Sequence, residues 1–311
     1  MKPAKARAYS SSANLGAGYD ILAVAHNAFF DEVTAIPLSE GKIDVKVIAD
    51  GIPQDYQKNT AGWAVYNMLK ELDLKVEVEL RVKKGVPIGL GLGSSGASSA
   101  AAVTAVNEAL GLNLSKLELV KFAMEGERAA AGEPHPDNVA ASIMGGFVAV
   151  TSVNPIHVIN ILPHKDLNLK FLLFIPQIYI ENKTKKAREM VPKVVDIKSH
   201  VTNSRYLASL LLGLQTGNKE LIKRGLNDEI VEKSRLPLFP FYTEFKKLGL
   251  EAGAVGVCVS GAGPTILAFI DESTNVNMLM TKGVEICDAH KVKCITKIAE
   301  IANGVEIEGA N

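Results

Sequence analysis

The stretch Pro87-Ile88-Gly89-Leu90-Gly91-Leu92-Gly93-Ser94-Ser95-Gly96-Ala97 decides how the rest of the chain is interpreted. It follows residues 76–82, whose alternation predicts a half-exposed strand, and it opens residues 97–110, which predict a helix. Glycines let a backbone approach a ligand closely, and a helix start offers unpaired N–H groups and the positive end of the dipole. Four glycines and a serine pair exceed what a packed turn needs, so the stretch predicts a phosphate-binding loop.

Two better-known phosphate loops do not fit this stretch. A Walker A loop requires a lysine after its last glycine, and none follows here. Gly91-x-Gly93-x-x-Gly96 matches the dinucleotide fingerprint by letter. The preceding strand is amphipathic, however, and residues 115–120 predict a helix where a ribose-binding acid should end a second strand. These features argue against a dinucleotide-binding oxidoreductase.

The composition narrows the class of protein. The chain has 311 residues, 47% of them hydrophobic, which is enough for one large domain or two of ordinary size. Its 34 basic and 34 acidic residues give a net charge of zero, so no strong field attracts nucleic acid or an anionic membrane. No signal peptide or membrane-spanning stretch is evident, and Cys258, Cys287 and Cys294 indicate no disulfide framework. We expect a cytoplasmic protein with neither nucleic acid nor membrane as partner.

Strand and helix patterns are segregated along the chain, which predicts an α+β fold in two lobes. Asn154, Pro155, Pro163 and the polar run to Lys170 predict a boundary, so we expect domains at residues 1–160 and 161–311. Ser115 with Glu118 predicts the capped start of a helix that ends near Ala131. The other expected strands are 42–47, 144–152, 171–176, 255–260 and 265–270, and the other expected helices are 59–72, 183–190, 199–216 and 219–232.

The phosphate loop resembles the P-x-G-x-G-L-G-S-S motif of the GHMP kinases. Two further segments resemble that superfamily, Ser11-Ser12-Ala13-Asn14-Leu15-Gly16-Ala17-Gly18-Tyr19-Asp20 and Val259-Ser260-Gly261-Ala262-Gly263-Pro264-Thr265. The first of these resembles the homoserine kinase family in particular. So do His135-Pro136-Asp137-Asn138 followed by Gly145-Gly146-Phe147, and the spacing of Arg188 and Arg235.

The resemblance implies the two-lobed GHMP kinase fold. Its N-terminal lobe resembles the second domain of ribosomal protein S5, and its C-terminal lobe is ferredoxin-like. The implied reaction is the ATP-dependent phosphorylation of L-homoserine to O-phospho-L-homoserine, a step toward threonine. Most members of the family are dimers, so a homodimer is expected.

The same resemblance implies the ligands of ATP and Mg²⁺. The loop from Pro87 to Ala97 would hold the phosphates, and Ser95 with Glu127 would bind Mg²⁺. A carboxylate with phosphate oxygens and waters is the usual shell of that ion. Asn59 would contact the adenine, although it is equally suited to cap the helix that begins near Thr60.

The acceptor homoserine is a zwitterion with a primary hydroxyl group. Arg188 and Arg235 are the candidates for its carboxylate, because a guanidinium binds a carboxylate bidentately. Asp20 and Asn14 are the candidates for its ammonium, with turn chemistry around Gly16 and Gly18 as their alternative role. Gly261 would approach the substrate with backbone atoms.

The segment His135-Pro136-Asp137-Asn138 carries the candidate catalytic groups, and its prolines predict an extended backbone. The resemblance places His135 beside homoserine. In other GHMP kinases an aspartate at the place of Asp137 is the proposed base, with a lysine from the first motif, but no lysine lies between Ser10 and Asp20. Because phosphoryl transfer needs little base catalysis, we expect Asn138 to orient the hydroxyl and Asp137 to act as a support or a weak base.

Two alternative functions remain open at this point. A GHMP kinase could act on another small hydroxyl compound, such as shikimate or mevalonate, but the arginine pair with Asp20 suits an amino acid. A member that has lost catalysis and serves as a binding module is the other alternative. Such a protein would be expected to lose the phosphate loop or the metal-binding acid, and this chain keeps both.

Overall fold

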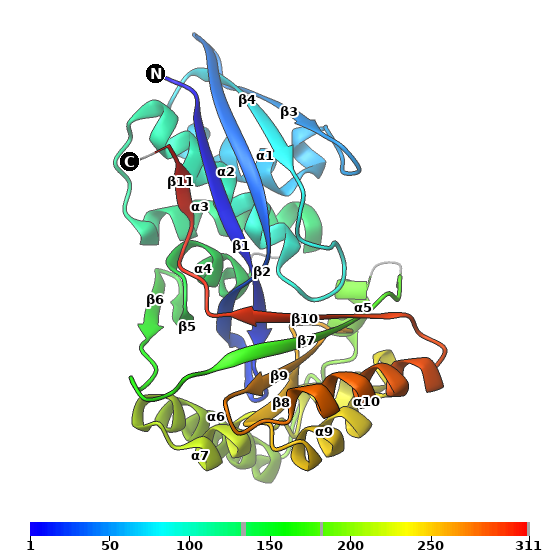
Figure 1. Cartoon of the computed structure of the whole chain (residues 1–311). Helices are drawn as coiled ribbons and strands as arrows, with labels where there is room; N and C mark the ends of the chain where they lie inside the picture. The colour runs from blue at the N-terminus through cyan, green and yellow to red at the C-terminus, as the bar shows by residue number, and fades with distance from the viewer. Residues whose placement is uncertain (132–134, 181–182, 310–311) are drawn as a thin grey trace.

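A computed structural model describes residues 1–131, 135–180 and 183–309, which are arranged around two sheets (Figure 1). Among these residues the first sheet has seven strands in the order β11-β1-β2-β4-β3, with β5 paired to β2 and β6 to β5. Their bounds are Ala4–Asn14 (β1), Gly18–Glu40 (β2), Asp44–Ala49 (β3), Val76–Lys83 (β4), Phe147–Val153 (β5), Ile156–Ile161 (β6) and Glu306–Glu308 (β11). All the pairs are antiparallel except β3 with β4.

Helices α1 (Thr60–Glu71), α2 (Ser94–Leu110), α3 (Lys116–Ala131) and α4 (Pro136–Met144) pack with this sheet. Helix α2 is buried along most of its length, because its alanines and serines let the neighbouring helices and strands approach closely. The predicted capping of α3 is confirmed, since the Ser115 backbone N–H donates to Glu118 at 2.8 Å and the Glu118 N–H donates to the Ser115 hydroxyl at 3.3 Å.

The second sheet contains four antiparallel strands within the described residues, in the order β10-β7-β9-β8. Their bounds are Cys294–Glu300 (β10), Lys170–Pro176 (β7), Ile266–Ile270 (β9) and Gly256–Val259 (β8). The remaining α-helices of the described residues are α5 (Lys183–Glu189), α6 (Ile197–Thr216), α7 (Lys219–Gly225), α8 (Val231–Arg235), α9 (Tyr242–Glu251) and α10 (Val276–Ala289).

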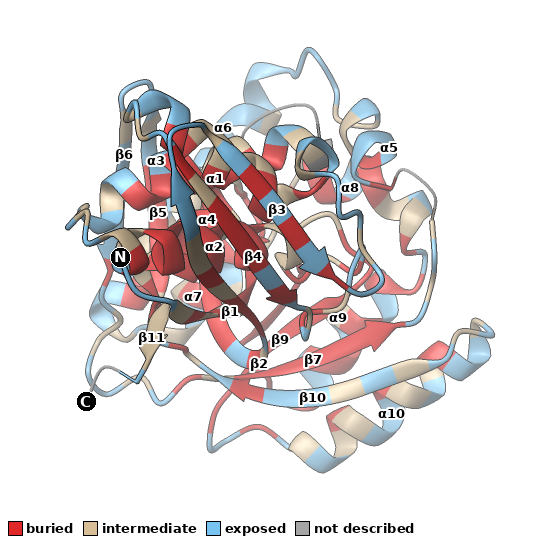
Figure 2. Ribbon diagram, turned by 90° about the horizontal axis from the view of Figure 1, so that it is seen from above, coloured by how far each residue is buried: buried red, intermediate tan, exposed pale blue. Residues whose placement is uncertain are grey.

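Strand β7 separates two hydrophobic cores. Phe171 and Leu173 pack into the core shared with the first sheet, whereas Leu172 and Phe174 pack into the core beneath α9 and α10. Because both faces of β7 are covered, its sequence is a continuous apolar run and not an alternating one. Figure 2 shows that β7 is buried along most of its length, whereas its neighbour β10, at the edge of the sheet, is partly exposed.

The predicted α+β class is confirmed, and most predicted elements lie within a few residues of the observed ones. Three local predictions are wrong. Residues 136–138 form the first turn of α4, because Pro136 stands at the helix start, where a missing N–H is tolerated; Pro134 lies outside the described residues. Strand β5 begins only at Phe147, since α4 continues to Met144.

The third wrong prediction is the single helix over residues 219–232. It is divided into α7 and α8. The Asp228 carboxylate accepts hydrogen bonds from the N–H groups of Ile230 and Glu232, at 2.7 and 3.0 Å, and so starts a new helix.

The last strand returns to the beginning of the chain. Strand β11 pairs with β1, with Lys5 opposite Glu308 and Arg7 opposite Glu306. The division of the chain into domains at residue 160 stays a prediction. None of the described helices is long and apolar enough to cross a membrane.

Candidate active site

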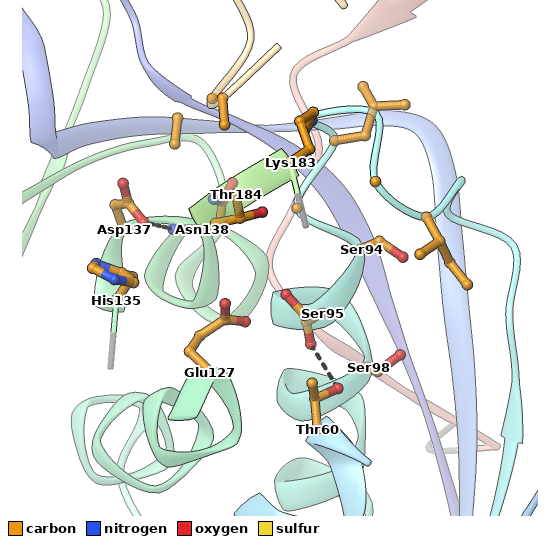
Figure 3. Close-up of a pocket in the computed structure, with 18 of the residues that line it drawn as sticks. Thr60, Ser94, Ser95, Ser98, Glu127, His135, Asp137, Asn138, Lys183 and Thr184 are labelled. Carbon is orange, nitrogen blue, oxygen red and sulfur yellow. Dashed lines mark hydrogen bonds between the residues drawn. The ribbon is translucent and has the colours of Figure 1, made fainter. Parts of the chain in front are cut away.

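A cavity of about 320 Å³ gathers most of the predicted site residues (Figure 3). Its walls come from the turn between β1 and β2, the phosphate loop, α1, α3, α4, α5, α8 and the turn after β8. The predicted residues that line it are Asn14, Asp20, Asn59, Ile88, Gly89, Gly91, Leu92, Gly93, Ser94, Ser95, Glu127, His135, Asp137, Asn138, Arg188, Arg235 and Gly261.

Four residues of the predicted phosphate loop are not among those that line the cavity: Pro87, Leu90, Gly96 and Ala97. Leu90 and Ala97 are buried in the core, and the Leu90 carbonyl accepts from the Thr265 N–H at 3.4 Å. A Cβ on Gly96 would lie 3.3 Å from the Cβ of Asn138, so this glycine lets α2 and α4 approach closely. Leu90, Gly96 and Ala97 therefore support the loop from behind.

The phosphate loop ends at the start of helix α2, where the N-cap residue is a glycine. Helix α2 begins at Ser94, after Gly93 with φ of 66°, and among the described residues no side-chain group accepts from its first N–H groups. Gly91 lies against the turn after β8, where an added Cβ would be 2.8 Å from the Gly263 oxygen. A larger residue would separate the two loops. The uncapped N–H groups at the cavity wall are the feature that a phosphate requires.

Lys84 is a pocket residue that sequence reasoning missed. Its ammonium forms an ion pair with the fully buried Asp31 and donates to the Ser94 carbonyl at 2.8 Å and the Ser98 hydroxyl at 2.9 Å. Asp31 also accepts from the Gly85 N–H at 2.8 Å. Burial lowers the pKa of Lys84 and Asp31 opposes this effect. The pair fixes the base of the phosphate loop and places a cation beside it.

Glu127 and Ser95 are the candidates for holding a divalent cation. Glu127 is only 9% exposed, and its Oε1 finds no hydrogen-bond donor among the described residues. Burial raises the pKa of Glu127, and the Ser95 hydroxyl opposes this shift. Figure 3 shows both side chains directed into the same part of the cavity. An orphaned buried carboxylate oxygen beside a hydroxyl fits one side of a Mg²⁺ shell.

The rest of such a shell would have to come from the ligand and from water. Across the described residues there is no group of three or more His, Cys, Asp or Glu side chains placed to hold a metal ion. A site with few protein ligands is typical of Mg²⁺ that binds together with substrate phosphates.

Asp137 and Asn138 lie at the start of α4 (Figure 3). Asp137 is 4% exposed, and burial, with a contribution from Asp20, raises its pKa to about 7. The Asn138 side-chain oxygen accepts from the Ser11 hydroxyl at 2.9 Å. Nothing in the described part of the chain accepts from the Asn138 NH₂ group, so that group is available to a ligand in the cavity.

Charged groups of both signs occupy the other end of the cavity. Asp20 lies 4.0 Å from the Arg188 guanidinium and 3.8 Å from Nδ1 of His135. Arg235 is 4% exposed, its Nε donates to the Ala187 carbonyl at 2.7 Å, and its guanidinium also interacts with Tyr19 at the cavity wall. Burial lowers the pKa of Arg235. Two cations and one anion complement a zwitterionic amino acid.

Asn14 and Asn59 line the cavity, but their amide groups are already engaged. Asn14 donates to the Gly261 carbonyl at 2.8 Å and accepts from the Asp20 N–H at 3.3 Å. Asn59 accepts from the Gly62 N–H at 3.1 Å, as a helix cap, and donates to the Pro53 carbonyl at 2.7 Å. Both residues therefore hold the walls of the cavity in shape.

A buried hydrogen-bond network connects residues 11–20, residues 259–265 and the phosphate loop. His26 lies between the hydroxyls of Ser10 and Ser12, each 3.0 Å from one ring nitrogen. The Ser260 hydroxyl is 2.7 Å from that of Ser12 and 2.6 Å from the Gly91 carbonyl oxygen. Burial lowers the pKa of His26 to about 3, so the network stays neutral near pH 7. It aligns the two loops without adding charge.

Several pocket residues besides Lys84 were missed: Tyr19, Thr60, Ser98, Lys183 and Thr184. Tyr19 belongs to the first motif, and its ring lies 5.1 Å from the Arg235 guanidinium carbon. Lys183 and Thr184 precede Arg188 on α5, so this segment contributes more residues to the pocket than the arginine that was predicted.

Comparisons with known proteins define the class. The family model described as the GHMP kinases N terminal domain matches residues 59–146, and the GHMP kinases C terminal model matches residues 210–279. Together with the fold and the phosphate loop, these matches show that the chain belongs to the GHMP kinases.

Relatives over the full length narrow the assignment to the homoserine kinase family. The chain is 53% identical to the homoserine kinase of Sulfolobus acidocaldarius over 305 residues, covering 98% of this chain and 99% of the relative. The crystal structure of homoserine kinase from Cytophaga hutchinsonii superposes with a TM-score of 0.89 at 31% identity, covering 99% and 98% of the two chains. A structure of MDDEF with MVAPP, AMPPCP and magnesium shares the fold, with a TM-score of 0.69, 21% identity and 98% coverage of each chain.

Proposed function

We propose that this chain transfers the terminal phosphoryl group of ATP to the side-chain hydroxyl of L-homoserine, giving ADP and O-phospho-L-homoserine in threonine biosynthesis. One observation carries the proposal. A single cavity holds an uncapped, glycine-rich helix start at one end and, at the other, charges of both signs suited to an amino acid. Full-length identity to homoserine kinases supports the same substrate.

At the nucleotide end, the N–H groups at the start of α2 bind the phosphate chain, and Lys84 keeps the loop in position. The Asp31 partner of Lys84 is fully buried, so the loop base is fixed before the nucleotide arrives. Ser95 and Glu127 hold Mg²⁺, which is consistent with the unsatisfied Oε1 of Glu127. When bound, Mg²⁺ neutralises negative charge on the phosphate oxygens.

At the acceptor end, Arg188 and Arg235 bind the carboxylate of homoserine. Asp20 binds the ammonium, and His135, beside Asp20, closes that part of the site. A substrate ammonium that replaces the long contacts of Asp20 gains a charge-assisted hydrogen bond. These groups fix the orientation of the acceptor before transfer.

The transfer itself depends on positioning. The Asn138 NH₂ group orients the hydroxyl oxygen, which forms a bond to the terminal phosphorus as the bond from that phosphorus to the leaving oxygen of ADP breaks. The hydroxyl proton leaves to solvent, with Asp137 as a weak acceptor on the way. A pKa of about 7 leaves Asp137 partly protonated near neutral pH, which suits this secondary role.

Three further statements belong to the same proposal. The protein is cytoplasmic, and residues 1–160 and 161–311 are its two domains. It forms a homodimer, as the family resemblance implies. Light scattering should then give twice the chain mass of 33.2 kDa, and a mass equal to one chain would contradict the dimer.

A panel of acceptors tests the proposed function directly. ADP release is measured with L-homoserine, L-serine, shikimate and mevalonate, and the product is identified by mass spectrometry. We expect kcat/KM for L-homoserine to exceed that for each other compound by at least about 10²-fold, because a site with paired polar groups rejects analogues that leave them unpaired. A higher value for shikimate or mevalonate would contradict the proposal.

A further inference from the structure

Lys183 is a buried cation that the mechanism above does not use. It is the first residue of α5, lines the cavity and is only 6% exposed. Its ammonium donates to the Gly263 carbonyl. Within the described residues no carboxylate lies at ion-pair distance from it, and the charged side chain that influences it most is Arg235, which has the same sign.

A buried ammonium with one carbonyl partner is unfavourable unless an anion reaches it. Transfer of a charge away from water costs several kcal/mol when no counter-ion compensates it. Burial and Arg235 together lower the pKa of Lys183 to about 7, as expected for a cation that lacks an anion. Because this side chain lies in the wall of a ligand cavity, the missing anion is a group on the ligand.

The position of Lys183 distinguishes between the anions that the cavity receives. Its Gly263 partner belongs to the turn that packs on the phosphate loop, and the Gly263 oxygen lies 2.8 Å from the site of a Cβ on Gly91. The ammonium is therefore at the junction of that turn and the phosphate loop. Figure 3 shows Lys183 beside Thr184, on the wall across the cavity from Glu127.

The acceptor carboxylate has cations of its own, Arg188 and Arg235, near Asp20 and Tyr19. We propose that Lys183 binds the terminal phosphoryl group of the nucleotide and stabilises its charge during transfer to the acceptor. Lys183 thus faces Glu127 and Ser95 across that group, so the ammonium would reach the phosphoryl oxygens from one side and a Mg²⁺ ion held by Glu127 and Ser95 from the other. This inference rests on the proposed phosphoryl transfer, but not on the identity of the acceptor.

Nucleotide binding without acceptor provides the test. Calorimetry compares the affinity of the Lys183→Met variant for an ATP analogue with a β,γ-imido bridge and for ADP, both with Mg²⁺. We expect the affinity for the analogue to fall about tenfold or more and the affinity for ADP to change less than about twofold. In turnover, kcat should fall about 10²-fold, as for the loss of one preorganised charge contact, while KM for homoserine changes less than about threefold.

Two further variants separate charge from structure. Lys186→Met removes an exposed lysine from the same helix and should leave every constant unchanged. Lys183→Gln keeps a donor for the Gly263 carbonyl but removes the charge, so it should lose affinity for the analogue as Lys183→Met does, with a melting temperature close to that of the unmodified protein. Lys183→Arg should recover part of that affinity.

Equal losses of analogue and ADP affinity in Lys183→Gln, no loss of either, or a change confined to the KM of homoserine would each overturn the inference. The acceptor panel on the unmodified protein tests the proposed function separately, because these binding measurements contain no acceptor.

Discussion

The two ends of the cavity differ in how their charged side chains are paired. At the nucleotide end the Lys84 cation is already paired with the buried Asp31, and neutral N–H groups stand at the start of α2. At the acceptor end Asp20 stands 3.8 Å from His135 and 4.0 Å from Arg188, distances too long for good hydrogen bonds. The base of the phosphate loop is fixed before any ligand arrives, whereas the contacts of Asp20 are completed by the acceptor. Substrate selection should therefore reside at the acceptor end.

The largest expected effect comes from removing the anionic group that binds metal at the nucleotide end. Glu127→Gln keeps the shape of the side chain and should reduce kcat about 10³-fold, because the charge stabilisation that a metal ion supplies is worth several kcal/mol. Activity is measured while Mg²⁺ is titrated, and Mn²⁺ binding is measured separately.

The neighbouring Glu125→Gln is the control for this change. Glu125 forms an exposed ion pair with Arg128 at 2.7 Å and does not line the cavity. An unchanged Mg²⁺ dependence in Glu127→Gln would remove Glu127 from the metal site.

The second effect concerns the acceptor end alone. Arg235→Leu should raise KM for homoserine about 10²-fold and KM for ATP less than about twofold, since a charge-assisted carboxylate contact is worth about 1.5–3 kcal/mol. Steady-state kinetics with each substrate varied gives both constants. The exposed Arg224→Leu serves as the control, and equal shifts in the two KM values would show that the two ends are not independent.

A third, smaller effect tests whether Asp137 has a supporting role or acts as an essential general base. Asp137→Asn should lower kcat less than about tenfold, whereas loss of an essential base typically costs about 10² to 10⁴. Single-turnover rates at saturating substrates measure this change. A loss within the larger range would restore Asp137 as the base.

Asp137 also makes stability depend on pH. The unfolded chain loses this proton near pH 3.8 and the folded chain near pH 7, so the folded protein holds one proton more between these values. The stability contributed by Asp137 is therefore lost as pH rises from about 4 to about 7. In thermal melts without ligands, the melting temperature of Asp137→Asn should rise relative to that of the unmodified protein as the pH increases from 5 to 8. A difference in melting temperature that stays constant over this range would contradict the burial effect.

The smallest expected effect tests whether Asn59 supports the cavity wall or contacts the nucleotide. Asn59→Ala should lower the free energy of unfolding by about 1 kcal/mol through loss of the cap of α1, and raise KM for ATP less than about threefold. Urea unfolding and nucleotide kinetics measure the two quantities. Asn59→Asp keeps the cap and should retain most of the stability, and a large rise in KM for ATP in that variant would indicate a direct adenine contact.

The nucleotide end was largely predictable from sequence because its chemistry is contiguous. The glycines, the serine pair and the helix start all lie within one short segment, and periodicity identifies the helix. Lys84 was not predicted as a site residue because its partner Asp31 lies 53 residues earlier in the chain. The two meet only through the pairing of β2 with β4, where Glu32 is opposite Lys83. No local pattern contains that register.

The acceptor end depended on the family resemblance, because its charged groups come from β2, α5 and α8 and the segment before α4. Strand β1 was missed for a different reason. Ser10, Ser11 and Ser12 are all fully buried, so the strand does not alternate between polar and apolar residues there. Their hydroxyls satisfy His26 and Asn138, partners that only the fold provides.

The pairing of β11 with β1 determines how this chain can be assembled at the ribosome. The edge of β1 stays open until residues 306–308 emerge, after every other described strand has been synthesised. Lys5 and Arg7 meet the Glu308 carboxylate only at that moment, at 2.8 and 2.6 Å. An unpaired edge invites pairing with other chains during synthesis. The first sheet is therefore completed only after all the other described strands have been made, although most of its residues are made first.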